Sequence, residues 1–346
     1  MDNMKYIAFF YLLFLAGCSS IAPEHFSLKT NSSTDDLALG DTLYFDLSNP
    51  KEHQVQSINF SFNGENTAND FVIINKLGNQ RLVVNFTSNN QPITLNQSFT
   101  VFANTPPDVY SYKLINTYPH DKNAYTQGLE FYKGELYEST GQYGLSSLRK
   151  TDYKTGAILK KLPLNASYFG EGLTFVNDLA VQLTWKENIG FVYDPDDFTL
   201  LRSFPYLSSK EGWGLCSDQK IVYKTDGTEK LWKLDPVTFE EQEYVDIVTH
   251  NKIISKVNEL EFVDGRIYAN TYQFNKEVVL IIEPNSGQVV GVVDFSGLKE
   301  KVTKHNQLDV FNGIAYHPER KTFFVTGKYW DKLFEVQILK KVKANE

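Results

Sequence analysis

Five residues that could bind a ligand or move a proton recur at one position of a segment repeated in the second part of the chain. Each stands at the start of a short apolar run, and in most copies a small residue follows it. The set offers one carboxylate, three amides and one indole, which would suit proton transfer to a small polar ligand if all five met at one place. The residues are Gln127, Glu171, Trp213, Asn258 and Asn312, and subtraction of their numbers gives spacings of 44, 42, 45 and 54.

A second set of residues follows fourteen positions after each member of the first. The last member, Lys328, follows Asn312 by sixteen positions, and it matches the others if the turn at 317–321 is two residues longer than the corresponding turns. A lone glutamate near a glycine is usually a solvated turn residue, and a lone tryptophan usually belongs to a core. The common register instead predicts a small-ligand site with aromatic walls and one lysine. The second set is Gly141, Trp185, Gly227, Tyr272 and Lys328.

The repeat also predicts the elements that must hold these residues. Every copy continues with a polar turn and a second strand-like run, and a period of about 40 to 50 residues with about four strands is typical of β-propeller blades. We therefore expect an all-β chain in which residues 109–346 form a five-bladed β-propeller, whose first strands line a central channel. The fifth repeat ends early, so Tyr110–Ile115 should supply its missing outer strand and close the ring. An open solenoid is the alternative, and a short helical turn is expected near Leu298–Lys304.

A targeting signal is predicted at residues 1–18. Lys5 precedes the apolar run Tyr6–Leu15, which is too short to span a bilayer, and Leu15-Ala16-Gly17-Cys18 matches a bacterial lipoprotein cleavage box. Cys18 would become the lipidated first residue, which predicts an extracytoplasmic protein anchored by lipid to a bacterial membrane. An ordinary signal peptide is the alternative. Residues 19–28 should form a tether, and alternating segments punctuated by Asn, Ser, Gly and Pro predict a small, immunoglobulin-like β-sandwich over 29–104.

Composition and missing motifs exclude several classes of protein. The net charge is −8 and no basic tract is present, so we expect no nucleic-acid partner. The six histidines show no metal-ligand spacing, so no metal site is predicted, although a structural ion is left open. No GxSxG elbow, Cys/His pattern or phosphate loop occurs, and no cofactor is expected to be required. Cys216 is expected to be a buried small apolar residue.

The ordered motifs of the repeat region resemble one known family, the plant-type (papaya-latex type) glutaminyl-peptide cyclotransferases. The resemblance runs from about Tyr110 to Ile338 in the same order and leaves the N-terminal segments outside. Members of that family fold as a five-bladed propeller and are unrelated to the zinc-dependent animal enzymes. The resemblance therefore implies an enzyme that works without metal. The motifs are Tyr125–Leu129, Leu136–Gly141, Gly144–Arg149, Tyr168–Thr174, Trp185–Phe191, Asp226–Thr228, Asn258–Phe262 and Phe324–Glu335.

The resemblance implies conversion of the N-terminal glutamine of peptides or proteins to pyroglutamate, with release of ammonia. Glu171 would be the catalytic residue. Two positions depart from the family pattern: Tyr125 replaces Phe, and Tyr272 replaces Trp. The tyrosine at 272 keeps an aromatic wall but makes it smaller and adds a hydroxyl. The substrate-binding residues would be Tyr125, Gln127, Trp185, Trp213, Asn258, Tyr272 and Lys328.

Two other functions stay open from the residues alone. An extracellular propeller could capture a ligand without chemistry, because this fold serves many functions. A propeller could also act on sugars as a hydrolase or lyase, but that reaction would want paired carboxylates across the pore, and only Glu171 belongs to the channel set. A carboxylate placed for proton transfer beside Lys328 and two indoles favours the cyclase.

Overall fold

The fold is built almost entirely from β-strands, as the sequence predicts. The computed structural model describes residues 23–341, in which the helical elements are the 3-10 turns η1 (Pro23–His25) and η2 (Lys299–Lys301). The turn η2 confirms the helical turn expected near Leu298–Lys304. Across this described range, no helix is long and apolar enough to cross a bilayer. The predicted signal peptide and Cys18 lie outside the described residues.

The chain divides into two compact units. Within the described range, the first comprises residues 23–33, 42–72 and 81–98, and the second comprises 34–41, 73–80 and the chain from 99 onward. The strands up to residue 102 form two sheets, in the orders β1-β3-β6 and β2-β8-β7-β4-β5. Their bounds are β1 Ser27–Thr30, β2 Asp36–Ala38, β3 Thr42–Ser48, β4 Val55–Phe62, β5 Glu65–Asn66, β6 Phe71–Ile73, β7 Gly78–Ser88 and β8 Gln91–Phe102.

The first unit has its own apolar core, to which both of these sheets contribute. Phe86 of β7 and Ile93 of β8 are buried together with Phe26, and Leu47 of β3 packs against them. Side chains along β7 alternate between buried and more exposed positions, which is the pattern of a strand with one face on a core. Strand β1 begins at Ser27, so ordered structure starts within the stretch 19–28 that the sequence assigned to a tether.

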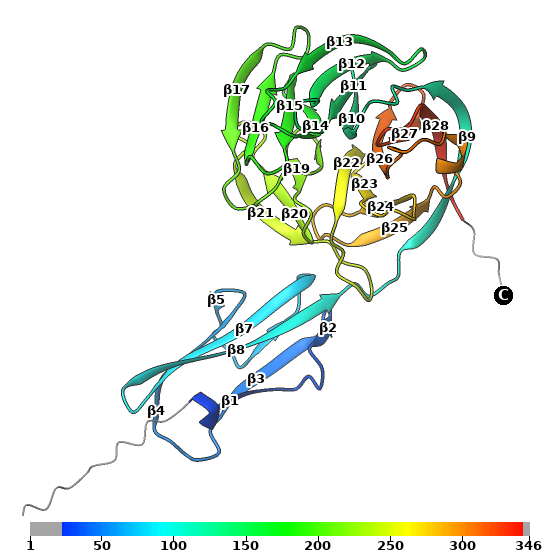
Figure 1. Cartoon of the computed structure of the whole chain (residues 1–346). Helices are drawn as coiled ribbons and strands as arrows, with labels where there is room; N and C mark the ends of the chain where they lie inside the picture. Colours follow the sequence, from blue (N-terminus) through cyan, green and yellow to red (C-terminus); the bar gives the residue numbers. More distant parts are fainter. Residues whose placement is uncertain (1–22, 342–346) are drawn as a thin grey trace, which may run out of the picture. The chain divides into compact units, whose positions relative to one another are not determined.

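The second unit contains antiparallel four-stranded meanders arranged around a common centre (Figure 1). Three of them form separate sheets, and the last two belong to one eight-stranded sheet in the order β22-β23-β24-β25-β9-β28-β27-β26. The bounds are β9 Asp108–Pro119, β10 Thr126–Tyr132, β11 Glu135–Thr140, β12 Ser147–Asp152, β13 Ala157–Pro163, β14 Gly170–Val176, β15 Leu179–Thr184, β16 Ile189–Tyr193, β17 Leu200–Pro205, β18 Leu215–Ser217, β19 Val222–Thr225, β20 Lys230–Leu234, β21 Glu241–Asp246, β22 Val257–Val263, β23 Arg266–Thr271, β24 Val278–Ile282, β25 Val289–Asp294, β26 Phe311–His317, β27 Thr322–Gly327 and β28 Lys332–Lys340.

The first strand of each meander lies at the centre. Strands β10, β14, β18, β22 and β26 each contact the next one, and β26 returns to contact β10, so these five strands form a closed ring. Every residue of β14 is buried, whereas the outer strand β13 of the neighbouring sheet is mostly exposed. Side chains at the start of the inner strands therefore meet around one axis, away from bulk solvent.

Strand β9 joins the last sheet to the preceding one and so closes the circle of sheets, as predicted for Tyr110–Ile115. It runs antiparallel to β28, with Ser111 opposite Leu339, and parallel to β25, with Tyr110 opposite Val293. The last repeat is one strand short, and the strand that precedes the first repeat completes its sheet. Both edges of the gap are paired, so no open strand edge remains there.

Candidate functional site

The predicted channel residues sit where the inner strands leave regular pairing. The pairing register between the first and second strand of a sheet shifts at three places, between Thr126 and Gly128, between Gly170 and Leu173, and between Val257 and Leu260. These shifts enclose Gln127, Glu171 and Asn258, respectively. The same shift occurs at Phe311/Ile314, around Asn312. A bulge turns a side chain out of the alternating pattern of a strand and is common beside active sites. These bulges direct polar side chains toward the axis at one end of the ring.

The second predicted set lies at the same end. Trp185, Tyr272 and Lys328 directly follow β15, β23 and β27. Because each second strand is antiparallel to its first strand, its end lies beside the start of the first strand, which explains the constant spacing in the sequence. The glycines of this set make room. A Cβ on Gly141 would meet the Phe169 ring at 2.3 Å, and one on Gly227, where φ is +80°, would meet the Trp213 ring at 2.6 Å.

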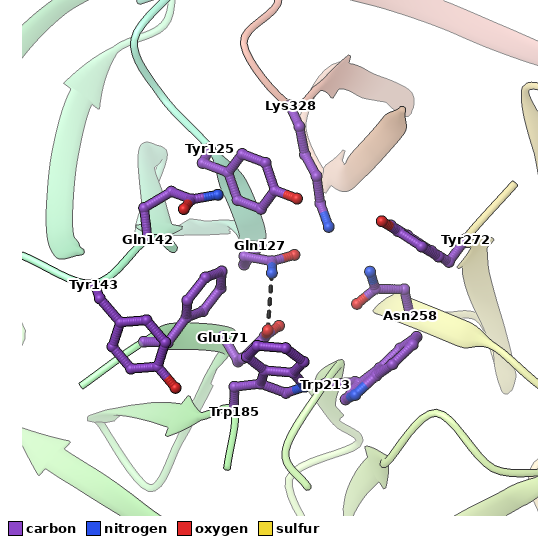
Figure 2. Close-up of a pocket in the computed structure, with 11 residues that line it drawn as sticks. Tyr125, Gln127, Gln142, Tyr143, Glu171, Trp185, Trp213, Asn258, Tyr272 and Lys328 are labelled. Atoms are coloured by element: carbon purple, nitrogen blue, oxygen red, sulfur yellow. Dashed lines mark hydrogen bonds between the residues drawn. The ribbon is translucent and has the colours of Figure 1, made fainter. Parts of the chain in front are cut away.

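Most members of both sets line one cavity of about 380 Å³ (Figure 2), while Gly141 and Gly227 stand beside it. Glu171 and every residue that the sequence predicts to bind substrate line this cavity. Asn312 does not line it; it is buried and donates to the backbone oxygen of Thr126 at 2.9 Å and to Gln127 Oε1 at 3.3 Å. The lining residues are Tyr125, Gln127, Gln142, Tyr143, Phe169, Glu171, Trp185, Trp213, Asn258, Tyr272 and Lys328.

Glu171 lines the cavity, and its side chain accepts a hydrogen bond from Gln127 (Figure 2). The Gln127 Nε2 to Glu171 Oε1 distance is 2.8 Å, and Glu171 is only 4% exposed. Its Oε2 is buried and makes no hydrogen bond within residues 23–341. Burial raises the pKa of Glu171 well above its ordinary value, the Lys328 ammonium opposes this rise, and the Glu211 and Glu187 carboxylates add to it. Glu171 therefore holds a proton more readily than an exposed carboxyl does.

Lys328 faces Glu171 from across the cavity. Its Nζ lies 4.7 Å from the ring centroid of Tyr125 and 4.9 Å from that of Tyr272, which places the ammonium between two aromatic faces. Burial lowers the pKa of Lys328 to about 8, although Glu171 and Asp309 oppose this change. Tyr125 Oη donates to Asp309 Oδ2 at 3.3 Å, so this tyrosine has a fixed partner for the hydroxyl that distinguishes it from Phe.

The two pocket tryptophans share one partner that the sequence analysis missed. Trp185 Nε1 and Trp213 Nε1 each donate to Glu211 Oε2, both at 2.8 Å. Each indole has a single donor. Both N–H groups are therefore occupied by Glu211, and the indoles present ring surface to the cavity.

Comparison with known proteins identifies the family. A family model described as glutamine cyclotransferase matches residues 86–338. A glutaminyl-peptide cyclotransferase of Arabidopsis thaliana is 36% identical over 230 residues, which covers 65% of this chain and 71% of the plant protein. The crystal structure of the glutaminyl cyclase of Myxococcus xanthus matches with a TM-score of 0.63 and 33% identity, over 68% of this chain and 100% of the bacterial one.

This chain belongs to the glutamine cyclotransferase family. The predicted family is thereby confirmed, and so is the predicted class of enzyme, a glutaminyl-peptide cyclotransferase and hence a transferase. The match reaches from residue 86 to 338 and so contains every residue that lines the cavity.

Four residues near this cyclotransferase pocket were not predicted. Gln142 and Tyr143 follow Gly141 of the second set, and Phe169 stands two positions before Glu171 in a motif already noted. Because these three residues lie close to the repeat positions in the sequence, they could have been predicted to line the same cavity. Glu211 stands two positions before Trp213 in a loop, and only its charge next to an aromatic residue could have drawn attention.

Within residues 23–341, no group of three or more His, Cys, Asp or Glu residues is arranged to hold a metal ion. The His120 side chain, which is 8% exposed, pairs with Glu138, with Nε2 to Oε1 at 3.2 Å. Cys216 is buried, as predicted, and burial raises the pKa of its thiol well above the ordinary value.

Proposed function

We propose that this cyclotransferase closes the N-terminal glutamine of a peptide or protein into pyroglutamate, with Glu171 as the group that moves the proton. The observation that carries this proposal is the free, buried Oε2 of Glu171 in a cavity lined by aromatic rings and facing Lys328. A cavity of about 380 Å³ suits one amino-acid residue and the start of the next. Only the first residue of the substrate needs to enter.

The reaction requires one proton to move twice. The α-amine nitrogen attacks the γ-carboxamide carbon, a carbon–nitrogen bond forms, and the amine loses a proton to Glu171. Glu171 then returns that proton to the carboxamide nitrogen, the bond from this nitrogen to carbon breaks, and ammonia leaves. The raised pKa of Glu171 suits both halves, because burial makes the carboxylate a stronger base toward the amine than an exposed carboxylate, and the acid that results can then protonate the leaving nitrogen.

Lys328 is placed to stabilise the negative oxygen that develops on the attacked carbon. It is the only lysine or arginine among the described residues that line the cavity. An indole N–H group of Trp185 or Trp213 is the alternative donor to this oxygen. Both N–H groups donate to Glu211, which favours Lys328. The buried Asn258 Oδ1 has no hydrogen-bond partner within residues 23–341, so it can accept from the substrate.

Release of ammonia from a glutaminyl dipeptide tests this proposal. We expect ammonia and a cyclised product in equal amounts, and no reaction with the matched asparaginyl dipeptide, because its shorter side chain would have to close a strained four-membered ring. Binding of the glutaminyl dipeptide without ammonia release would instead identify a binding module and overturn the proposal. A sugar-cleaving function would need a second carboxylate free in the cavity, and Glu211, the nearest candidate, is held by the two indoles.

We infer that residues 109–346 form a five-bladed β-propeller and that residues 29–104 form an immunoglobulin-like sandwich. The closed ring of five inner strands supports the propeller. The core shared by two sheets supports the sandwich. We further propose these ranges as the domain limits, with the sandwich as a spacer or docking module.

We also propose that the mature protein works outside the cytoplasm, anchored by lipid on Cys18 to a bacterial membrane. The support is the motif Leu15-Ala16-Gly17-Cys18 after an apolar run. Proteins or peptides that begin with glutamine would be its substrates in that compartment, and it would need no cofactor or catalytic metal. Labelling of the protein with a radioactive fatty acid in a bacterial host, lost in Cys18→Ala, would test the anchor.

A further inference from the structure

The two pocket tryptophans come from different parts of the fold but are joined through one side chain. Trp185 follows β15, and Trp213 precedes β18 in the next sheet. Both donate to the same oxygen, Glu211 Oε2. A hydrogen bond to a carboxylate is about twice as strong as one between neutral groups. Glu211 therefore fixes the rotation of both indole rings at once.

Glu211 is itself held by a buried ion pair. Its backbone oxygen accepts a hydrogen bond from Lys224 Nζ at 2.9 Å, and Lys224 pairs with Glu241 at 3.1 Å, with side chains 0% and 2% exposed. Glu241 Oε2 also accepts from the backbone nitrogens of Ser208 and Ser209, at 2.8 and 3.1 Å. The loop that carries Glu211 is thus tied to β19 and β21, so the carboxylate has a defined position before any substrate binds.

We propose that Glu211 is a positioning residue for the substrate pocket, which acts by holding Trp185 and Trp213 in the orientation that turns their ring faces toward the glutamine side chain. This inference rests on the proposed cyclase function. Without the carboxylate, each indole N–H would have to find water or a cavity-lining oxygen such as Glu171 Oε2, which is free. Ring rotation toward that oxygen would narrow the cavity and occupy the proton-moving group.

The test compares Glu211→Gln, which keeps an acceptor oxygen, with Glu211→Leu, which removes it at similar volume. We expect Glu211→Leu to raise KM for a glutaminyl dipeptide at least about 10-fold, as the loss of charge-assisted hydrogen bonds predicts. Its near-ultraviolet circular dichroism should change, because the tryptophans lose their fixed orientation. Glu211→Gln should stay within about 3-fold of wild type in KM and keep the wild-type spectrum.

Glu187→Gln is the matched control. Glu187 is a second carboxylate near Glu171 and accepts from Tyr143 Oη at 2.8 Å, but it touches no indole N–H. It should leave the tryptophan spectrum unchanged. If Glu211→Leu does not fold, Trp213→Phe takes its place, because it keeps a ring and removes the N–H. Trp213→Phe should raise KM. The double variant Trp213→Phe with Glu211→Gln should have a KM little higher than that of Trp213→Phe alone.

Wild-type KM and spectrum in a folded Glu211→Leu would overturn the proposal. An equal rise of KM in Glu211→Gln and Glu211→Leu with the wild-type spectrum in both would also overturn it, because the charge of Glu211 and not the orientation of the indoles would then matter. Failure of the wild-type protein to release ammonia would refute the proposed function instead, while the spectra would still report whether Glu211 holds the indoles.

Discussion

Replacement of Glu171 by Gln separates proton transfer from every other property of this side chain. The variant keeps the length and shape of the side chain, and its amide oxygen can still accept the 2.8 Å hydrogen bond from Gln127 Nε2. What disappears is the ability to take a proton from the amine and return it to the leaving nitrogen. General acid–base catalysis contributes about 10²- to 10⁴-fold, or about 2.7 to 5.5 kcal/mol, so kcat should fall by that factor.

A second consequence of Glu171→Gln decides the assay conditions. Glu171 raises the pKa of Lys328, which burial holds at about 8, so removing the carboxylate lowers that pKa further. The ammonia-release assay should therefore compare variant and wild type at a pH well below 8, such as about pH 6, so that loss of the Lys328 proton contributes least to the difference. A variant that kept more than about a tenth of wild-type kcat there, with an unchanged melting curve, would refute proton transfer by Glu171 and leave it as a substrate anchor.

The same variant should also be more stable than wild type at neutral pH. The pKa of Glu171 is raised in the folded protein, so the folded state binds more protons than the unfolded state between the ordinary carboxyl value, about 4.3, and the raised one. Stability therefore falls as pH rises through this window, and Gln removes that loss. The difference in Tm, variant minus wild type, should grow as pH rises above about 4; a constant difference would contradict the burial argument.

Three further predictions concern charge, metal and chain closure. Lys328→Met should raise KM and lower kcat, and Lys328→Arg, which stays charged, should retain relatively more of its activity than wild type as pH rises through about 8. Strong chelators should leave ammonia release nearly unchanged in a folded protein, and a loss restored only by zinc would contradict this. A chain starting at Asp108 should fold and cyclise, whereas one starting at Ala124 lacks β9 and should show no cooperative melting; a folded but inactive chain from Asp108 would show that the preceding residues help to build the site.

The sequence predicted which residues meet at one cavity where repeated strands carry them. Glu171 and Lys328 belong to different sets, yet the antiparallel pairing of first and second strands brings both sets to one end of the ring. The sequence could not predict what depends on loops and side-chain rotation. Glu211 lies between strands, where no periodicity marks it, and the spacing of Trp185 and Trp213 says nothing of where their N–H groups point. Asn312 has the right spacing but serves to support Gln127 from outside the cavity.

The pairing of β9 with β28 has a consequence for how the chain folds. Asn116 of β9 bonds to Glu335 of β28, 219 residues later, and Lys340 lies opposite Tyr110. As the chain leaves the ribosome, β9 emerges before any strand of the ring but has no antiparallel partner until β28 is made. Such long-range pairing is slow and leaves an unpaired edge exposed in the meantime. Strand β28 thus completes the cyclotransferase, and a chain stopped short of it would be a target for chaperones and proteases rather than a partly active enzyme.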